Sequence, residues 1–338
     1  MAVIDASLLA EALRDPDSVS RLDEQGWTAL IAIARAEQLL GTLAWRVDGL
    51  LMPSGAAAVL ADARQAAESA RRTALWEAET ARRALAPLGC PVVLLKGTAF
   101  AAAGLLAGQG RSIGDLDILV PRAVLDGVEA ALIGAGWEWV KPDPYDDAYY
   151  RRWMHELPPL IHRDRDRMID VHHTILPPTA RVTPDAAALI AGAVPLGNGL
   201  SVLSPADMIV HAAAHLFADG DLAGGLRNLW DIRCLLDEFG AEGLRQRAAR
   251  HELSAAVERA VRLSSALFGT EVPSGWQGGE ARDALFRRRL LARDDWGRAI
   301  RPATRAAFYV RSHWLRMPPA LLARHLWIKW RRVRAATA

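Results

Sequence analysis

Cysteine is scarce in this sequence. Cys90 and Cys234 are the only cysteines in 338 residues, and neither belongs to a C-x-x-C pair or a Cys/His array. This usage excludes a disulfide framework and gives no indication of a structural zinc site. The N-terminal residues 1–7 also lack the basic start and apolar run of a secretory signal. We therefore expect a protein of the reducing cytoplasm.

Excess charge and long apolar runs are also missing. The 41 basic and 39 acidic residues leave a formal net charge of +2, so we expect no field strong enough to attract nucleic acid over the whole surface. The longest uncharged run, residues 186–206, approaches the length of a membrane span, but Pro195, Gly197 and Pro205 interrupt it. The sequence predicts a hairpin or loop there and no transmembrane segment.

What is present is an ordinary globular composition, with 51% apolar and 24% charged residues and no internal repeat. The hydrophobic period divides the chain into three expected regions. Residues 1–88 read as a helical N-terminal region, residues 89–203 as an α/β core, and residues 204–338 as a C-terminal helical domain. The expected fold class is α+β, a small mixed sheet flanked by helical regions.

The predicted core alternates strands and helices. Short apolar runs rich in β-branched residues predict strands, and the 3.6-residue stripes between them predict helices. The expected strands are residues 92–96, 116–120, 137–140, 157–162 and 168–174, and the expected helices are residues 98–106 and 121–134. After this core, Ser204 supplies a capping-box-like start to a helix that reaches Phe217.

Two carboxylates stand at alternate positions of the strand 116–120 and its entry. Because side chains alternate along a strand, Asp115 and Asp117 project from one face while Leu116 and Ile118 project from the other. Adjacent like charges are unfavourable unless a cation neutralises them, one is protonated, or both are well solvated, and we favour a cation. Hard oxygen ligands suit Mg²⁺ or Mn²⁺.

Asp170 lies in another predicted strand, with Ile169 and Val171 on the opposite face. If that strand neighbours the first one, three carboxylates converge, which is an arrangement that can hold two ions for in-line phosphoryl displacement. Asp170 would then be a metal ligand and could accept the proton of the nucleophile. The simpler reading of a lone D-x-D pair is exposed charge at a strand entry.

The preceding turn, Lys96-Gly97-Thr98, joins a strand to a helix. Gly97 permits close approach of the backbone to a phosphate, Thr98 offers a hydroxyl donor, and a helix N-terminus favours anions. Lys96 and Arg111 can each pair with phosphates or with the carboxylates. For Arg111 we favour a site role over a structural ion pair, and for Lys96 the two interpretations are equal.

Residues 95–98, 111–120 and 169–172 together resemble the uncharacterised bacterial nucleotidyltransferase family of the DNA polymerase beta-like superfamily. That family has a glycine followed by a small residue, then D-x-D, then a third acidic residue. The resemblance implies that Gly97 and Thr98 contact a triphosphate, that Asp115 and Asp117 bind metal, and that Asp170 is the third catalytic acid. Ser112 lies in the same motif and is grouped with the nucleotide-binding residues.

Histidines and a basic tail are the remaining candidates. The pairs His155-Glu156 and His172-His173 can bind metal in principle, but the sequence lacks H-E-x-x-H, so zinc is not favoured. His211 and His215 are interpreted as a packed polar face rather than as a cleft lining, and residues 227–231 as helix-pairing residues. The arginines of residues 71–83 are interpreted as a solvated face. The Trp-containing tail 325–334 is interpreted as a terminal helix that docks its aromatic side chains while its arginines stay in water, with an interfacial helix or a nucleic-acid contact as the alternative.

These observations lead to one main hypothesis and two alternatives. The main hypothesis is metal-dependent transfer of a nucleoside monophosphate from an NTP to a hydroxyl or phosphate of an unidentified small molecule, peptide or protein. The first alternative is a tailoring transferase that acts on a peptide or sugar phosphate with another activated donor. The second is a non-catalytic nucleotide-binding protein.

Overall fold

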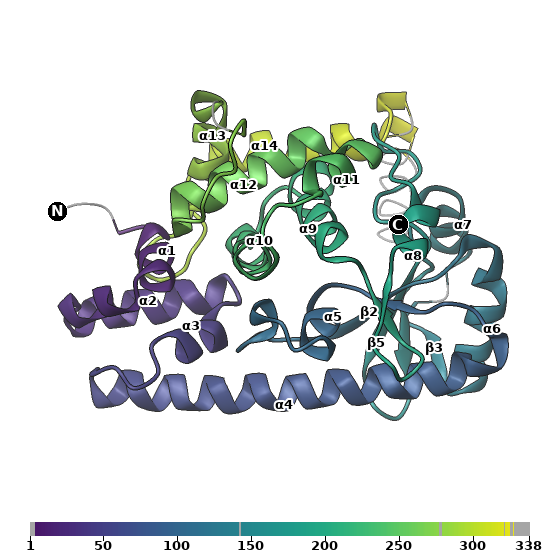
Figure 1. The fold of residues 1–338 in the computed structure, drawn as a ribbon, viewed down its shortest axis with the longest axis horizontal. Coiled ribbons are helices and arrows are strands. Elements are labelled where there is room, and N and C mark those ends of the chain that lie inside the picture. Colours follow the sequence, from purple (N-terminus) through teal and green to yellow (C-terminus); the bar gives the residue numbers. More distant parts are fainter. Residues whose placement is uncertain (1–3, 142, 277–278, 321, 325–326, 328–338) are drawn as a thin grey trace, which may run out of the picture.

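The computed structural model describes residues 4–141, 143–276, 279–320, 322–324 and 327. Within this part of the chain, helices surround a mixed sheet (Figure 1). The elements before the sheet are α1 (Ser7–Arg14), η1 (Pro16–Arg21), α2 (Glu24–Ala36), α3 (Leu40–Arg46), α4 (Ser54–Leu85) and η2 (Ala86–Leu88). The elements of the sheet region are β1 (Val93–Leu94), α5 (Lys96–Ala102), η3 (Leu106–Gly108), β2 (Asp115–Leu119), η4 (Arg122–Val124), α6 (Leu125–Gly134), β3 (Trp137–Trp139), α7 (Pro144–Trp153), β4 (Leu160–His162), β5 (Met168–His172), α8 (Ala186–Ala191), β6 (Val194–Pro195) and β7 (Ser201–Val202). The C-terminal elements are α9 (Pro205–Ala214), the π-helical turn η5 (His215–Asp219), α10 (Gly225–Phe239), α11 (Leu244–Arg250), α12 (Ser254–Phe268), α13 (Glu280–Leu290) and α14 (Pro302–Arg316).

The seven strands lie in the order β3-β4-β5-β2-β1-β7-β6. The two central strands that carry aspartates, β2 and β5, are parallel, and β1 runs antiparallel to β2 on its other side. In the register of the parallel pair, Asp117 lies opposite Asp170 and Ile118 lies opposite Val171. Leu116, Ile118, Ile169 and Val171 are all buried, so the apolar face of these strands faces the core. This register decides where the carboxylates meet.

The long helix α4 runs along the lower edge of the molecule in Figure 1, beneath α3, α5 and the sheet. Its buried face is narrow and rich in alanine, which lets the neighbouring elements approach closely; the buried residues are Ala56, Leu60, Ala67, Ala74, Glu77, Ala78, Ala81 and Leu85. The arginines on its outer face pair with Glu68 and Glu79 of the same helix at i,i+3 and i,i+4 spacing. The solvated face predicted for residues 71–83 is confirmed.

The C-terminal helices α9, α10, α11 and α12 pack against one another above the sheet region. The N-terminal helix α1 returns to pack on α12, and α10 contacts η3 of the core. Most buried apolar residues of the described chain form one cluster that extends from Ala6 to Phe308, and Ala74, Ala101 and Ile113 form a second, small one. Helices α9 and α10 consequently form one wall of the space beside β1 and α5. The expected boundaries at residues 88/89 and 203/204 stay predictions.

The α+β fold class is confirmed, and most expected core elements are present with shorter bounds. The strand predicted over residues 92–96 is shorter in the structure and comprises only β1. The chain leaves the extended conformation at Lys96, which has a left-handed φ of 49° and is the first residue of α5. The sequence interpretation omitted α7, a polar helix capped by the Asp143 carboxylate, which accepts hydrogen bonds from the N–H groups of Tyr145 and Asp146. Residues 186–206 contain α8 and the β6–β7 hairpin, and in the described part of the chain no helix is long and apolar enough to cross a bilayer.

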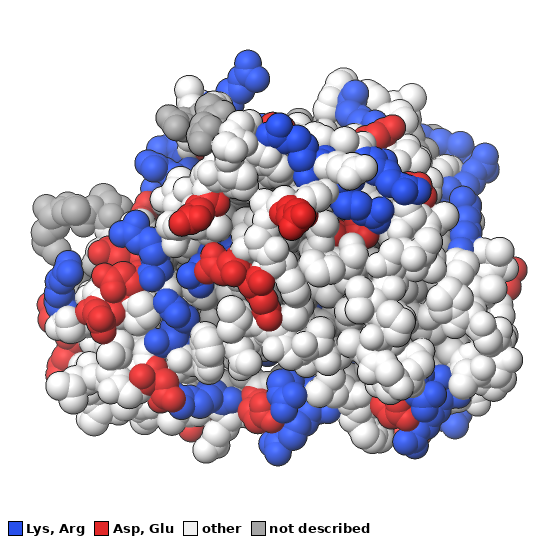
Figure 2. Space-filling model, in the orientation of Figure 1, with Lys and Arg blue, Asp and Glu red and all other residues white. Residues whose placement is uncertain are grey.

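Acidic and basic side chains are interspersed on the face of the molecule shown in Figure 2. This mixture agrees with the net charge of +2. The basic tail expected to dock its aromatic side chains, residues 325–334, lies outside the described residues except for Trp327, whose side chain is exposed.

Candidate active site

The structure brings the three predicted carboxylates together. Asp115 begins β2 and is exposed, Asp117 is buried two residues later on the same face, and Asp170 lies opposite Asp117 on β5. One carboxylate oxygen from each of the three residues lies within 4.8 Å of the other two. Strand alternation places the first two on one face, and parallel pairing supplies the third. The resulting cluster offers hard oxygen ligands on a rigid base.

Asp117 is the best-neutralised member of the cluster. Its Oδ1 atom lies 2.6 Å from Lys96 Nζ and 3.0 Å from His172 Nε2. Burial alone would raise the pKa of Asp117, but Lys96 and His172 outweigh burial and hold this pKa well below its ordinary value. Burial alone would likewise lower the pKa of Lys96, yet the charges of Asp117, Asp115 and Glu156 raise it. The two groups therefore form a charged pair near neutral pH.

Asp170 behaves in the opposite way. Burial, together with the negative charges of Asp117 and Glu156, raises the pKa of Asp170 to about 7. A carboxyl group with that pKa is crowded by other negative charge and lacks enough positive charge to offset it. A divalent cation among the three carboxylates would supply the missing charge, and their oxygen donors fit Mg²⁺ or Mn²⁺. The cluster therefore fits the predicted metal.

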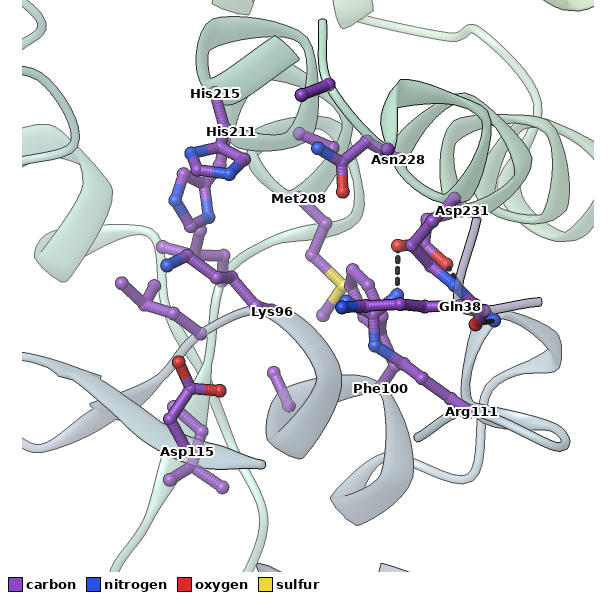
Figure 3. A pocket seen from close by; sticks show the side chains of 18 of the residues that line it. Gln38, Lys96, Phe100, Arg111, Asp115, Met208, His211, His215, Asn228 and Asp231 are labelled. Carbon is purple, nitrogen blue, oxygen red and sulfur yellow. Dashed lines mark hydrogen bonds and ion pairs between the residues drawn. The ribbon is translucent and has the colours of Figure 1, made fainter. Parts of the chain in front are cut away.

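A cavity of about 450 Å³ opens beside this cluster (Figure 3). Asp115 and Lys96 line it from the sheet region, and His211 and His215 line it from α9 and η5. Its opposite end is formed by Arg111 with Asp231 of α10. This volume lies in the range of small-molecule sites. The expectation that the two histidines form only a packed polar face is therefore wrong, because both face the cavity.

Arg111 lines the cavity and also forms an ion pair with Asp231. Its Nη1 donates to Asp231, and its guanidinium lies 5.6 Å from the centre of the Phe100 ring. Arg227 also pairs with Asp231 and donates from Nη2 to Gln38 O and Thr42 Oγ1, each at 2.7 Å. These bonds agree with the helix-pairing interpretation of residues 227–231, but Arg227, Asn228 and Asp231 also line the cavity, so their alternative role as acceptor contacts stays a prediction. The ion pair of Arg111, which the sequence analysis left as the second choice, is also present.

Three predicted nucleotide-binding residues lie outside the lining of this cavity in the described part of the chain. Gly97 is buried beneath Arg111, and a Cβ atom there would meet Arg111 Nε at 2.5 Å. Thr98 is buried, with its hydroxyl 3.5 Å from the Asp115 carbonyl oxygen, and Ser112 is exposed. The structure therefore gives Gly97 and Thr98 packing roles, and their contacts with a triphosphate stay predictions.

The sequence allowed Lys96 to pair with the carboxylates, but the contact of His172 with Asp117 was missed. His172 bonds Asp117 through Nε2 and approaches Glu156 with Nδ1, whereas from the sequence His172 was considered only as a possible zinc ligand, a role that was not favoured. Burial, followed by the nearby positive charge of Lys96, lowers the pKa of His211 well below its ordinary value, so this ring is neutral near pH 7. The position of His172 two residues after Asp170 was the available signal, because alternate strand residues share a face.

The D-x-D strand, its parallel partner and the adjoining cavity define a nucleotidyltransferase-type α/β core. The profile of the family described as "uncharacterised nucleotidyltransferase" matches residues 23–269, which is more than half of the 338-residue chain. The chain belongs to this family and is, by that membership, a nucleotidyltransferase.

Among solved structures, the chain is similar to the solution structure of the antibiotic-resistance factor ANT(2'')-Ia. The sequence identity is 17% and the TM-score is 0.36, over 55% of this chain and 96% of that chain. No curated protein matches the chain with significant similarity.

Proposed function

We propose that this protein transfers a nucleoside monophosphate from an NTP to a hydroxyl or phosphate group of an acceptor, with pyrophosphate as the leaving group. The observation that carries this proposal is the parallel register of β2 and β5, which places Asp170 beside Asp115 and Asp117. Family membership supports nucleotidyl transfer in general. The Mg²⁺ or Mn²⁺ dependence, the NTP donor and the cytoplasmic location are our finer assignments.

The three aspartates and Lys96 receive roles that their positions support. Asp115, Asp117 and Asp170 would hold the divalent cation, which when bound would neutralise charge on the donor phosphates. Lys96 keeps Asp117 neutralised and lines the cavity, so its ammonium can contact donor phosphates. Asp170 is assigned as the acceptor of the proton that the acceptor hydroxyl loses. We keep Gly97, Thr98, Arg111 and Ser112 as expected nucleotide contacts.

The volume of the cavity limits the size of the ligand that it can hold. Its 450 Å³ volume suits one small ligand or the end of a larger one, and its lining mixes Phe100 and Met208 with charged groups. We therefore expect the donor to lie across Asp115 and Lys96. The acceptor, whether a small molecule, a peptide or a protein, would enter through the same opening.

The first test is a donor screen. Thermal stability would be measured with each of the four NTPs and with sugar nucleotides, in the presence of Mg²⁺ or Mn²⁺. A donor at 100 times its Kd stabilises the folded state by about 2.7 kcal/mol, a shift that melting curves resolve. Pyrophosphate release and labelling from the α-³²P form of the best donor would follow.

The second test removes the carboxylates one at a time. We expect Asp115→Asn and Asp170→Asn to lower pyrophosphate release about 100-fold, because losing about 3 kcal/mol of charge stabilisation corresponds to that factor. Asp164→Asn is the matched control, since that aspartate is exposed near β5 and its loss should leave the rate unchanged. Equal rates in all of these proteins would contradict the assignment of the cluster.

A further inference from the structure

A second group of metal-binding side chains lies next to the three aspartates. His155 and Glu156 belong to the segment between α7 and β4, and His172 ends β5. Glu156 forms an antiparallel bridge with His172, and the segment is held on both sides by Leu157 N–H donating to Val171 O and His173 N–H donating to His155 O, both at 2.9 Å. Backbone hydrogen bonds therefore fix the three side chains relative to one another.

The distances in this group are close to those of a metal site. Glu156 Oε2 lies 3.4 Å from His172 Nδ1 and 3.9 Å from His155 Nε2. One ligand atom from each of the three residues lies within 4.8 Å of the other two. In a tetrahedral zinc site with bonds of about 2.1 Å, neighbouring ligand atoms are about 3.4 Å apart. Small side-chain rotations would therefore bring all three into place.

The opposite nitrogen of His172 already has the partner that metal-bound histidines usually have. Its Nε2 lies 3.0 Å from Asp117 Oδ1, and a carboxylate at that position orients a metal-binding imidazole. When Nε2–H donates to Asp117, the Nδ1 lone pair points toward the Glu156 carboxylate. The Nδ1 atom lies 3.4 Å from Glu156 Oε2, which is the spacing of two ligand atoms on one tetrahedral ion.

His155 supplies the third candidate ligand. It turns Nε2 toward the same Glu156 oxygen, and its ring lies 5.2 Å from that of His172, centre to centre. Its Nδ1 is buried without a hydrogen-bond partner in the described part of the chain. A cation placed among these three groups would contact both rings and the carboxylate. Two imidazoles and one carboxylate are typical ligands of zinc and related transition metals and suit Mg²⁺ poorly.

We propose that His155, Glu156 and His172 bind a zinc-type transition-metal ion at a site separate from the three-aspartate cluster. Asp117 connects the two groups, because it is a member of the cluster and also holds the second nitrogen of His172. Three protein ligands leave one coordination position open. The proposal does not depend on nucleotidyl transfer.

Cobalt is the probe for this site. The metal-stripped full-length protein would be titrated with Co²⁺, which reports coordination through its visible absorption. We expect one Co²⁺ to produce a nitrogen-ligand spectrum that an equivalent of Zn²⁺ abolishes and a large excess of Mg²⁺ leaves unchanged. Absence of such a spectrum, or its loss on adding Mg²⁺, would overturn the proposal.

Variants locate the bound ion. His155→Ala and Glu156→Gln should each weaken Co²⁺ binding at least tenfold, whereas Asp170→Asn and the α14 control His313→Ala should bind Co²⁺ like the native protein. Circular dichroism would verify folding, and Glu156→Gln, which preserves side-chain size, gives the answer if His155→Ala does not fold. Unchanged affinity in the folded site variants, or loss of Co²⁺ only in Asp170→Asn, would assign the metal elsewhere and overturn the proposal.

Discussion

Two aspartates that face each other across β2 and β5 have pKa values displaced in opposite directions. Asp117 is bonded to Lys96 and His172, which keep it ionised. Asp170 has the negative charges of Asp117 and Glu156 beside it and has less positive charge to offset them. The difference follows from the partners alone, since burial raises the pKa of both carboxyl groups. A cation is therefore needed more at Asp170 than at Asp117.

Gly97 provides a prediction at the residue scale. An alanine there would place Cβ 2.5 Å from Arg111 Nε and 3.1 Å from Arg111 Cδ, so Arg111 would have to move away from Asp231. We expect Gly97→Ala to lower the free energy of unfolding by about 1–3 kcal/mol, as overpacking does. Urea denaturation measures the effect.

The matched control is Gly55→Ala on α4, where an added Cβ meets nothing within 4 Å. This change should be neutral or stabilise by up to about 1 kcal/mol, because alanine favours helix. If Gly97→Ala had the same free energy of unfolding as Gly55→Ala, the Arg111 side chain would be able to move aside without destabilising the protein.

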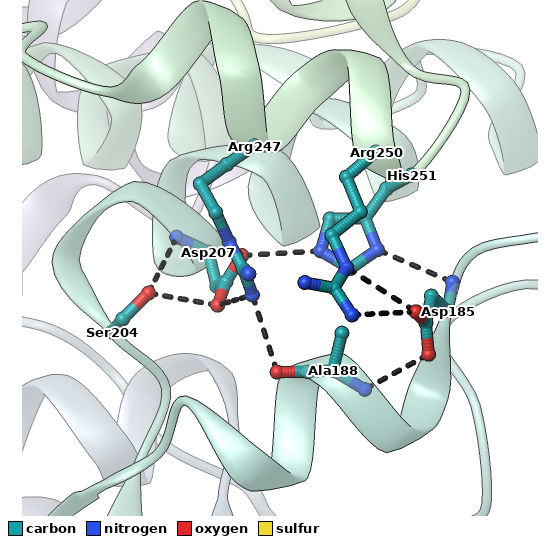
Figure 4. A network of polar contacts seen from close by, with 7 residues as sticks. All are labelled: Asp185, Ala188, Ser204, Asp207, Arg247, Arg250 and His251. Carbon is teal, nitrogen blue, oxygen red and sulfur yellow. Dashed lines mark hydrogen bonds and ion pairs between the residues drawn. The ribbon is translucent and has the colours of Figure 1, made fainter.

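At the scale of elements, one polar network joins the start of α9 to α8 and α11 (Figure 4). Ser204 caps α9 and also donates its hydroxyl to Asp207 Oδ2 at 2.7 Å. The fully buried Asp207 carboxylate receives Arg247 Nε at 2.8 Å and lies 3.2 Å from His251 Nε2. A second carboxylate, Asp185, caps α8 and pairs with Arg250. The network thus fixes the helix that lines the cavity.

Asp207→Asn is expected to lower the free energy of unfolding at pH 7 by about 3 kcal/mol, the scale for removing one partner of a buried ion pair. Burial alone would raise the pKa of Asp207, but hydrogen bonds from His251, Arg247 and Ser204 lower it below its ordinary value. The stabilisation is therefore complete above the unfolded-state pKa of about 4 and is lost as the pH falls through the lower folded-state pKa.

The measurement is urea denaturation of the native protein and Asp207→Asn at several pH values from 7 to 3. The stability difference between the two proteins should stay constant down to about pH 4 and narrow below it. If the stability difference between the native protein and Asp207→Asn became larger as the pH fell, the lowered pKa of Asp207 would be contradicted. The comparison cancels the titration of carboxylates that both proteins share.

At the scale of the whole molecule, α4 ties the N-terminal helices to the far side of the sheet. Arg165, between β4 and β5, donates to both oxygens of Glu77 on α4 at 2.9 Å. Its guanidinium also lies over the rings of Trp76 and Trp137. Because Glu77 is buried, its ion pair with Arg165 supplies the neutralising charge.

Arg165→Met should therefore lower the free energy of unfolding by about 3 kcal/mol, since it leaves a buried carboxylate unpaired. Arg163→Met, in the same turn, removes an exposed arginine and should change stability by less than about 0.5 kcal/mol. Guanidinium denaturation of both variants tests the difference. If Arg165→Met were as stable as Arg163→Met, water would have to reach Glu77 and solvate its carboxylate.

The sequence by itself determined the features that depend on neighbouring residues. Strand alternation placed Asp115 and Asp117 on one face, and Ser204 followed by Asp207 marked the start of α9. The prolines and glycines of residues 186–206 predicted a hairpin or a loop, and the structure has the β6–β7 hairpin there. These features follow from local backbone geometry, which a short window of sequence contains.

Only the tertiary structure decided which distant residues meet. The register of β2 and β5 brought Asp170 to the cluster, and long-range pairing joined Lys96 to Asp117, 21 residues apart, and Arg111 to Asp231, 120 residues apart. It also placed His155 and Glu156 beside His172. No local period encodes such pairs, because they are selected by the packing of the whole core.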